Sequence, residues 1–267
     1  MRLRERELAG VVEAYERLSK EERLAPLPDP AAATPPKRPV PAPPEGGLIL
    51  RGYCTYLKQD KTGRIDRANQ FYYLENPDRW MAETQSDLLW LTKSERESLI
   101  PADPKVGERR DVADAIQKRF YGTIGIDYME GSVNSLPVRE STMTLTVEAA
   151  DDKKIALRLD GYAALGKPFD EKLRKEANSR GCELRVVGRV RYDRAKRTFS
   201  RFDVVGVGRG WGNKMDYVNR EVRIGDYPWL YGIACELVTG DAPQDRIPPY
   251  NMLHYNSTGP YFAAEGR

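Results

Sequence analysis

The chain has 267 residues, of which 40% are hydrophobic and 31% are charged, and its formal net charge is +3 at pH 7. No apolar run approaches the ~20 residues that a membrane-spanning helix needs, so we expect a soluble globular protein without a membrane span. A net charge this small does not by itself indicate a polyanionic partner. Residues 1–7 lack an apolar run after their basic residues, so we expect a cytoplasmic protein by default, with export left open if the N-terminus has been trimmed.

The first 45 residues divide into a predicted helix and a predicted linker. The i, i+3, i+4, i+7 spacing typical of an amphipathic helix is met by Leu8, Val11, Val12, Tyr15 and Leu18. We therefore expect an N-terminal helix in residues 1–25 that docks on a partner. Residues 26–45 hold nine of the nineteen prolines and predict a proline-rich linker, either a plain tether or a ligand for a proline-reading domain.

A β-rich globular domain is expected over residues 46–267. Its first part predicts two paired strands, then a helix opened by a capping box of Ser94 and Glu97, and a second helix around residues 111–120. The run at residues 121–128 reads as a strand. Further strands are predicted at residues 220–224 and 230–238.

The stretch from residue 141 to residue 207 carries the strongest pattern in the chain. Met143, Leu145 and Val147 alternate with threonines, and similar alternation recurs three more times. Because strand side chains point to opposite faces with period two, each run has one apolar face. The sequence therefore predicts an α+β fold, mainly antiparallel β, as a barrel or sandwich-like meander with a few short helices besides the N-terminal one.

Little in the chain favours catalysis. Cys54, Cys182 and Cys235 form no CxxC pair and are predicted to be small buried hydrophobes, with one disulfide left open if the protein is exported. His254 is the only histidine, so we expect no catalytic histidine pair, no metal site and no cofactor.

Carboxylates supply one enzymatic alternative. Two carboxyl groups held about 5–10 Å apart across a sugar would make a glycoside hydrolase. The candidates are Asp127 and Glu130, which lie near a predicted strand end, together with Asp160 and Asp203. A carboxylate-dependent hydrolase acting on a glycan-like polymer is therefore an alternative function.

A basic run on the predicted hairpin at residues 183–207 gives another alternative. Arg185, Arg189 and Arg191 share one parity and are expected to project from one face of the sheet. Such a face suits an anionic surface such as a nucleic-acid backbone or phospholipid. Exposed hairpins also carry basic residues to prevent edge pairing, so nucleic acid is the less favoured partner.

Aromatic residues crowd the last third of the chain. Rings with a polar group suit ligand grooves, because one side chain both stacks and hydrogen-bonds. The first candidates for ligand binding are Trp211, Trp229 and Tyr231. The alternative is that these rings pack an irregular tail onto the sheet.

The run from Arg201 to Gly208, followed by Trp211-Gly212 and later by residues 231–237, resembles runs in a group of bacterial proteins without an established activity. The resemblance covers the last third of the chain and implies no catalytic residue, and some such proteins are exported. The first hypothesis is therefore a non-catalytic binding or structural module with an unidentified ligand or protein partner.

Overall fold

The computed structural model describes residues 40–67, 72–73, 85–124, 136–173, 180–211, 222–223, 228–238, 242–250, 252 and 261–262, together with residues 17 and 19. The chain divides into two units, Met1–Val40 and Pro41–Arg267. The predicted N-terminal helix in residues 1–25 and most of the predicted linker lie outside the described residues. In the part that is described, no helix has both the length and the apolar character needed to cross a membrane.

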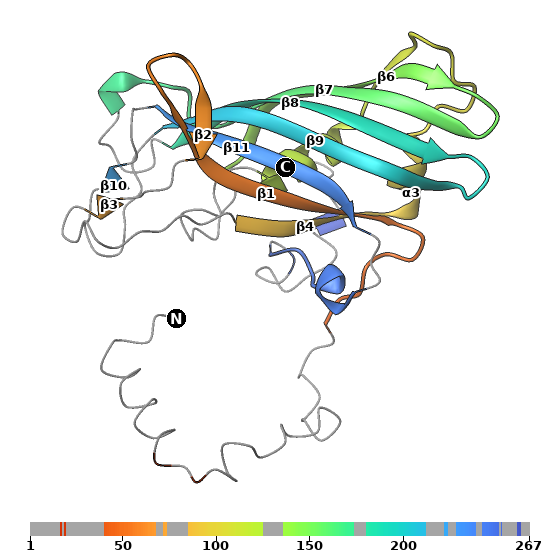
Figure 1. The fold of residues 1–267 in the computed structure, drawn as a ribbon, viewed down its shortest axis with the longest axis horizontal. Helices are drawn as coiled ribbons and strands as arrows, with labels where there is room; N and C mark the ends of the chain where they lie inside the picture. Colours follow the sequence, from red (N-terminus) through yellow and green to blue (C-terminus); the bar gives the residue numbers. More distant parts are fainter. Residues whose placement is uncertain are drawn as a thin grey trace. The chain divides into compact units, whose positions relative to one another are not determined.

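The second unit is built on one antiparallel sheet of nine strands (Figure 1). Its strands are β1 (Leu48–Gln59), β2 (Ile65–Arg67), β4 (Gln85–Leu91), β5 (Arg109–Asp111), β6 (Val138–Ala150), β7 (Lys154–Gly166), β8 (Gly181–Asp193), β9 (Thr198–Trp211) and β11 (Trp229–Val238). The strand order is β2-β1-β11-β9-β8-β7-β6-β5, and β4 pairs with β1. A separate two-stranded sheet joins β3 (Tyr72–Tyr73) to β10 (Val222–Arg223).

Short helices complete the described unit. These are α3 (Lys93–Ser98), α4 (Asp114–Ile124) and the 3-10 turns η3 (Glu171–Leu173) and η4 (Pro243–Arg246). The helix α3 begins with a capping box of Thr92 and Glu95, so the predicted box of Ser94 and Glu97 is wrong by two residues.

The prediction of four strands between residues 141 and 207 is confirmed by β6 to β9. Met143, Leu145 and Val147 are buried on β6, and the alternation of buried and exposed residues continues along β8. Two-residue periodicity therefore identified this part of the fold correctly, because one face of each strand packs on a common core.

The sheet is open, so the predicted barrel is wrong. Among the described strands, the order ends at β5 on one side and at β2 and β4 on the other, with no pairing between these ends. The layer against the inner face is the helix α4, which contacts β6, β4 and β1 and lies behind the strands in Figure 1. A helix, and not a second sheet as in a sandwich, thus covers this face.

Two glycines allow α4 to approach the inner face closely. A Cβ atom on Gly161 of β7 would lie 2.2 Å from the Tyr121 hydroxyl, and one on Gly52 of β1 would lie 2.7 Å from a methyl group of Ile124. The Tyr121 hydroxyl donates to the Thr142 carbonyl of β6 at 2.9 Å. Tyr121 and Ile124 belong to α4, so the strand predicted to begin at Tyr121 is wrong there.

Substitution of these glycines tests the docking of α4. Gly161→Ala should lower the free energy of unfolding by about 1–3 kcal/mol, because its methyl group must displace Tyr121. Gly122→Ala is the matched control: it lies on α4 with no atom within 4 Å of the added Cβ, so it should raise stability by about 0.5–1 kcal/mol. Urea unfolding measures both changes, and equal effects of the two variants would contradict this account.

Candidate functional site

The outer face of the sheet, opposite α4, carries the arginines of β8. Arg185, Arg189 and Arg191 are exposed, whereas the intervening Val186 and Val190 are buried. The three arginines therefore share the outer face, which is the arrangement expected from their parity.

These arginines differ from their neighbours in their partners. On β7, Arg158 pairs with Asp160 at 2.6 Å, and on β9, Arg201 pairs with Asp203. The Arg185 guanidinium lies 5.4 Å from the centre of the Tyr162 ring. Within the described part of the chain, no carboxylate pairs with Arg189 or Arg191. The outer face of β8 therefore presents two arginines that form no ion pair with a described residue, although Asp203, which Arg201 binds, lies opposite Arg189.

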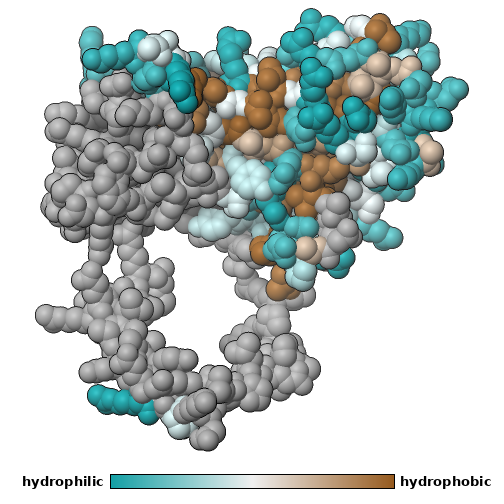
Figure 2. All heavy atoms as spheres, viewed as in Figure 1, coloured by the Kyte–Doolittle hydropathy of each residue, from teal (hydrophilic) through white to brown (hydrophobic). Residues whose placement is uncertain are grey.

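Three valines form an apolar cluster between these charges. The exposed fractions of Val187, Val205 and Val207 are 51%, 56% and 42%. Val187 lies opposite Val205 in the β8–β9 register, and Val207 lies opposite Arg185. Figure 2 shows hydrophobic residues gathered within a hydrophilic surround on this face. We call this set, with Arg185, Arg189 and Arg191, the valine–arginine face.

The same outer face is covered over β4 and β1. There a second apolar cluster contains Leu88, Trp90 and Met252, with partly buried residues packed against it: Ile49, Val238, Tyr261 and Phe262. Arg51 of β1 donates to the Asp245 carboxylate, and the Tyr53 hydroxyl donates to Glu236 at 2.6 Å. One half of the outer face is therefore covered by the chain's own C-terminal residues, while the valine–arginine face is bare.

The exposure of these three valines could have been predicted from their positions in the sequence. They have the parity of the exposed Arg185 and Arg209, so alternation alone places them outside. Valine is usually a core residue, but here the position along the strand decides the side on which each side chain lies.

Of the three predicted aromatic side chains, the two that the structure describes, Trp211 and Tyr231, lie on opposite faces of the sheet. Trp211 is 4% exposed, and its indole N–H donates to the Lys167 carbonyl at 3.0 Å. Tyr231 is fully buried and faces inward over Gly208, whereas Trp211 has the outward parity of Arg209. Trp229 pairs with Gly210, and its side chain lies outside the described part. Ligand binding by these three residues stays a prediction.

Two of the four carboxylate candidates are described, and they lie apart on the outer face of the sheet. Asp160 and Asp203 lie on β7 and β9, with β8 between them, and each pairs with an arginine of its own strand. Asp127, Glu130 and His254 lie outside the described residues. A hydrolase therefore stays a prediction without a described cleft that joins these acids.

Other reactive groups offer little chemistry in the described residues. Cys54, Cys182 and Cys235 are buried and form no disulfide there. Burial raises the pKa of Cys54 to about 12, so its thiol is protonated near neutral pH. The described residues contain no group of three or more histidine, cysteine, aspartate or glutamate side chains placed to hold a metal ion. A groove of about 260 Å³ lies between the end of α3 and the β8–β9 turn, lined in part by Arg96, Tyr192 and Arg197.

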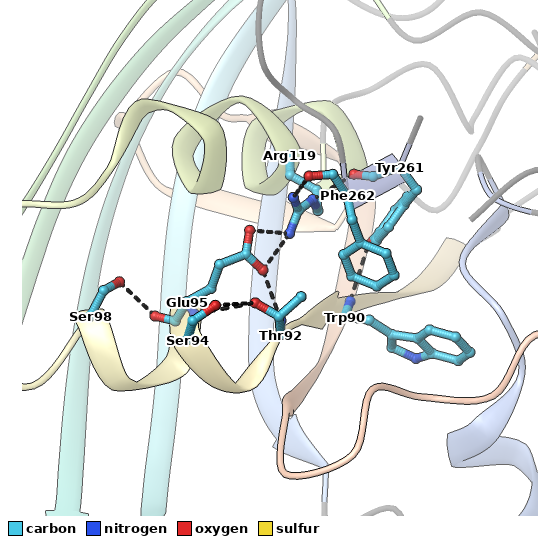
Figure 3. Close-up of polar contacts among 8 residues, drawn as sticks. All are labelled: Trp90, Thr92, Ser94, Glu95, Ser98, Arg119, Tyr261 and Phe262. Atoms are coloured by element: carbon cyan, nitrogen blue, oxygen red, sulfur yellow. Dashed lines mark hydrogen bonds and ion pairs between the residues drawn. The ribbon is translucent and has the colours of Figure 1, made fainter. Parts of the chain in front are cut away.

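A buried ion pair ties α3 and α4 to the C-terminal residues (Figure 3). One amino group of Arg119 donates to both carboxylate oxygens of Glu95, at 2.7 and 2.8 Å. The rest of the guanidinium donates to the carbonyls of Tyr261 and Phe262, at 3.0 and 3.4 Å, and lies 5.1 and 5.2 Å from the centres of their rings. The Arg119 side chain is only 4% exposed. No local sequence pattern marked this contact.

The environment of Glu95 lowers the pKa of its carboxyl group. Burial acts to raise the pKa of Glu95, but hydrogen bonds from Arg119 and from the Thr92 backbone outweigh burial, so the pKa lies below its ordinary value. A lowered folded pKa means that the ionised form stabilises the fold. This contribution is complete above the ordinary glutamate pKa of about 4.3 and is lost as the pH falls through the folded value.

Removal of the Glu95 charge should be costly. Glu95→Gln should lower the free energy of unfolding by about 3 kcal/mol at pH 7, because it leaves the buried Arg119 charge without its partner. Glu97→Gln, which removes an exposed partner of Arg96, should cost less than about 1 kcal/mol. Urea unfolding from pH 7 to pH 3 should show the difference between the native chain and Glu95→Gln shrinking below about pH 4. A difference that persists unchanged at pH 3 would contradict the proposed role of the carboxylate.

Comparison of the chain with protein-family models, curated proteins and solved structures finds no match. The resemblance of the last third to bacterial proteins thus stays an expectation.

Proposed function

We propose that the protein is a non-catalytic protein-binding module that docks its partner on the valine–arginine face. The observation that carries this proposal is the contiguity of Val187, Val205 and Val207 on an exposed sheet face. Single exposed apolar residues are normal, but a contiguous apolar patch with a polar rim is typical of an interaction site. Arginine is also enriched at protein interfaces, where lysine is depleted.

The chemistry of the face suggests the chemistry of the partner. The valines require an apolar centre, and the unpaired Arg189 and Arg191 favour carboxylates around that centre. The partner is therefore a protein surface with aliphatic or aromatic residues bordered by aspartate and glutamate. Binding a protein partner in this way requires no catalytic group on the described outer face.

One observation favours a second candidate, an anionic polymer such as nucleic acid. The unpaired arginines alone would attract a phosphate backbone. A polyanion has no use for the valine cluster, however, which is why we prefer a protein partner.

Site-specific crosslinking tests the location of the docking surface. A photo-crosslinking amino acid at Val187, in the full chain and in cells of the source organism, should give a discrete crosslinked product. The same group at Val106, which is 70% exposed in a loop, serves as the control and should not give that product. Equal products from both positions, or none from Val187, would remove the proposal.

Val205→Lys separates the two candidate functions by the sign of its effect. With the crosslinked protein purified as the probe, its affinity should fall at least about tenfold, or about 1.4 kcal/mol, because a lysine replaces an apolar contact. Binding to heparin should instead strengthen, because a cation has been added. Val106→Lys adds the same charge elsewhere and should leave the affinity for the protein probe unchanged. An unchanged affinity of Val205→Lys, with heparin retention that falls steeply with salt in the native chain, would favour the polyanion.

A further inference from the structure

The valine–arginine face belongs to a wider pattern of rows that cross four neighbouring strands, β7, β8, β9 and β11 (Figure 1). The register of these strands places residues of the outer face side by side in each row. The central row consists of Asp160, Val187, Val205 and Ala234. Its middle members are the two most exposed valines of the cluster. The boundary between β8 and β9 therefore runs through the apolar centre of the face.

The row on one side of this centre carries opposite charges on the two sides of the boundary. Arg158 of β7 lies beside Arg189 of β8, and Asp203 of β9 lies opposite Arg189. Glu236 of β11 is next in the row, one residue beyond the last pair of the β11–β9 ladder. All four side chains are exposed or half-exposed. One half of the row is thus cationic and the other half is anionic.

The row on the other side of the centre is apolar at both ends. It begins with Tyr162 of β7, whose ring lies under the Arg185 guanidinium, and it ends with Gly232 of β11. The Leu57 side chain of β1 lies over Gly232, with a methyl group 3.0 Å from the position of an added Cβ. An aromatic ring and an aliphatic side chain therefore occupy the two ends of this row.

A twofold axis along the β8–β9 boundary would bring each half of this pattern onto the opposite half of a second copy. In a twofold interface, a residue i contacts j of the other copy, and j contacts i in turn. Val187 then meets Val205 of the second copy, and Arg189 meets Asp203 of the second copy, each contact occurring twice. The face itself therefore has the apolar centre and the bordering carboxylates that its partner requires.

The two carboxylates of the charged row can serve a second arginine. Asp203 accepts a hydrogen bond from Arg201, and Glu236 accepts one from the Tyr53 hydroxyl. A carboxylate has about four lone-pair sites, so each of these acids has room for a donor of the second copy.

The end rows contribute little to this arrangement. Glu183 lies opposite Arg209, and Arg191 lies opposite Arg201, both about 13 Å from Val187 along the strands. Packed sheets cross at about 30°, which separates facing side chains at that distance by about 7 Å. The favourable end row and the row of like charges both lie at the solvated rim.

The size of the patch indicates a weak, reversible contact. Four strands and the span from Glu183 to Arg191 make a patch of about 19 by 27 Å. Two such patches would bury about 1,000 Å² in total, which is at the low end for specific interfaces.

We propose that the partner of the valine–arginine face is a second copy of this chain, packed face to face about a twofold axis along the β8–β9 boundary. This inference rests on the proposed function and deepens it by naming the partner. The central contacts are those between the valines and between Arg189 and Asp203.

Charge exchange between two variants tests this arrangement in the purified full chain. Sedimentation equilibrium from about 1 to about 100 μM should show a monomer–dimer equilibrium for the native chain. Arg189→Glu should weaken dimerisation at least about tenfold, because two carboxylates then face each other twice, and Asp203→Lys should do the same with two cations. An equimolar mixture of the two variants should restore dimerisation to within about threefold of the native value, because each new charge then faces the other.

The controls make the same charge changes away from the face. Lys105→Glu and Asp103→Lys alter side chains that are 78% and 85% exposed in the loop before β5, and each should leave dimerisation unchanged. Val205→Lys should weaken dimerisation without altering the charged row. Recovery in the mixture would also show that Arg189→Glu and Asp203→Lys are both folded.

Three results would overturn the inference. These are a native chain that stays monomeric at about 100 μM, a dimer that neither charge reversal weakens, and a mixture of the two variants that does not recover. The Val187 crosslink separates the inference from the proposed function. A product of twice the mass of the chain supports both, whereas a discrete product of another mass overturns the second copy as partner and leaves the proposed function in place.

Discussion

The close approach of α4 to the inner face of an open sheet is the constraint on which the rest of the described structure depends. An open sheet leaves the apolar side of its strands uncovered, and α4 is the helix that fills this space against β6, β4 and β1. Gly161 and Gly52 set its depth. At that depth Arg119 reaches Glu95 of α3 and the carbonyls of Tyr261 and Phe262. The position of α4 therefore determines both the packing of the core and the cover over β4 and β1.

The alternation of apolar and polar residues predicted the strands well, because it shows which side chains of a strand are exposed. It does not show which element covers the apolar face of the sheet. The strands β6 to β9 follow from their two-residue pattern, but the same pattern fits a barrel, a sandwich or an open sheet. Tyr121 and Ile124 are of types enriched in strands, but they continue α4 and pack over Gly161 and Gly52, contacts that no local pattern reveals. Likewise Thr92 with Glu95 and Ser94 with Glu97 both fit a capping box, and the partner Arg119 distinguishes them.

The candidate site was predictable where it depended on parity and unpredictable where it depended on long-range packing. Parity placed Arg185, Arg189 and Arg191 on one exposed face, and the same reasoning would have exposed Val187 and Val205. The covered half of the face could not be foreseen, because Trp90 meets Tyr261 across 171 positions of the chain. Aromatic type alone did not separate the inward Tyr231 from the outward Trp211.

The Glu95 carboxylate is shared between two tasks. It accepts a hydrogen bond from the Thr92 backbone amide at the start of α3. It also accepts hydrogen bonds from Arg119, which itself donates to the carbonyl of Tyr261. Groups that share one partner do not contribute independently. Formation of the six-residue helix α3 and attachment of Tyr261 and Phe262 are therefore thermodynamically linked through this one carboxylate, so weakening one is expected to weaken the other.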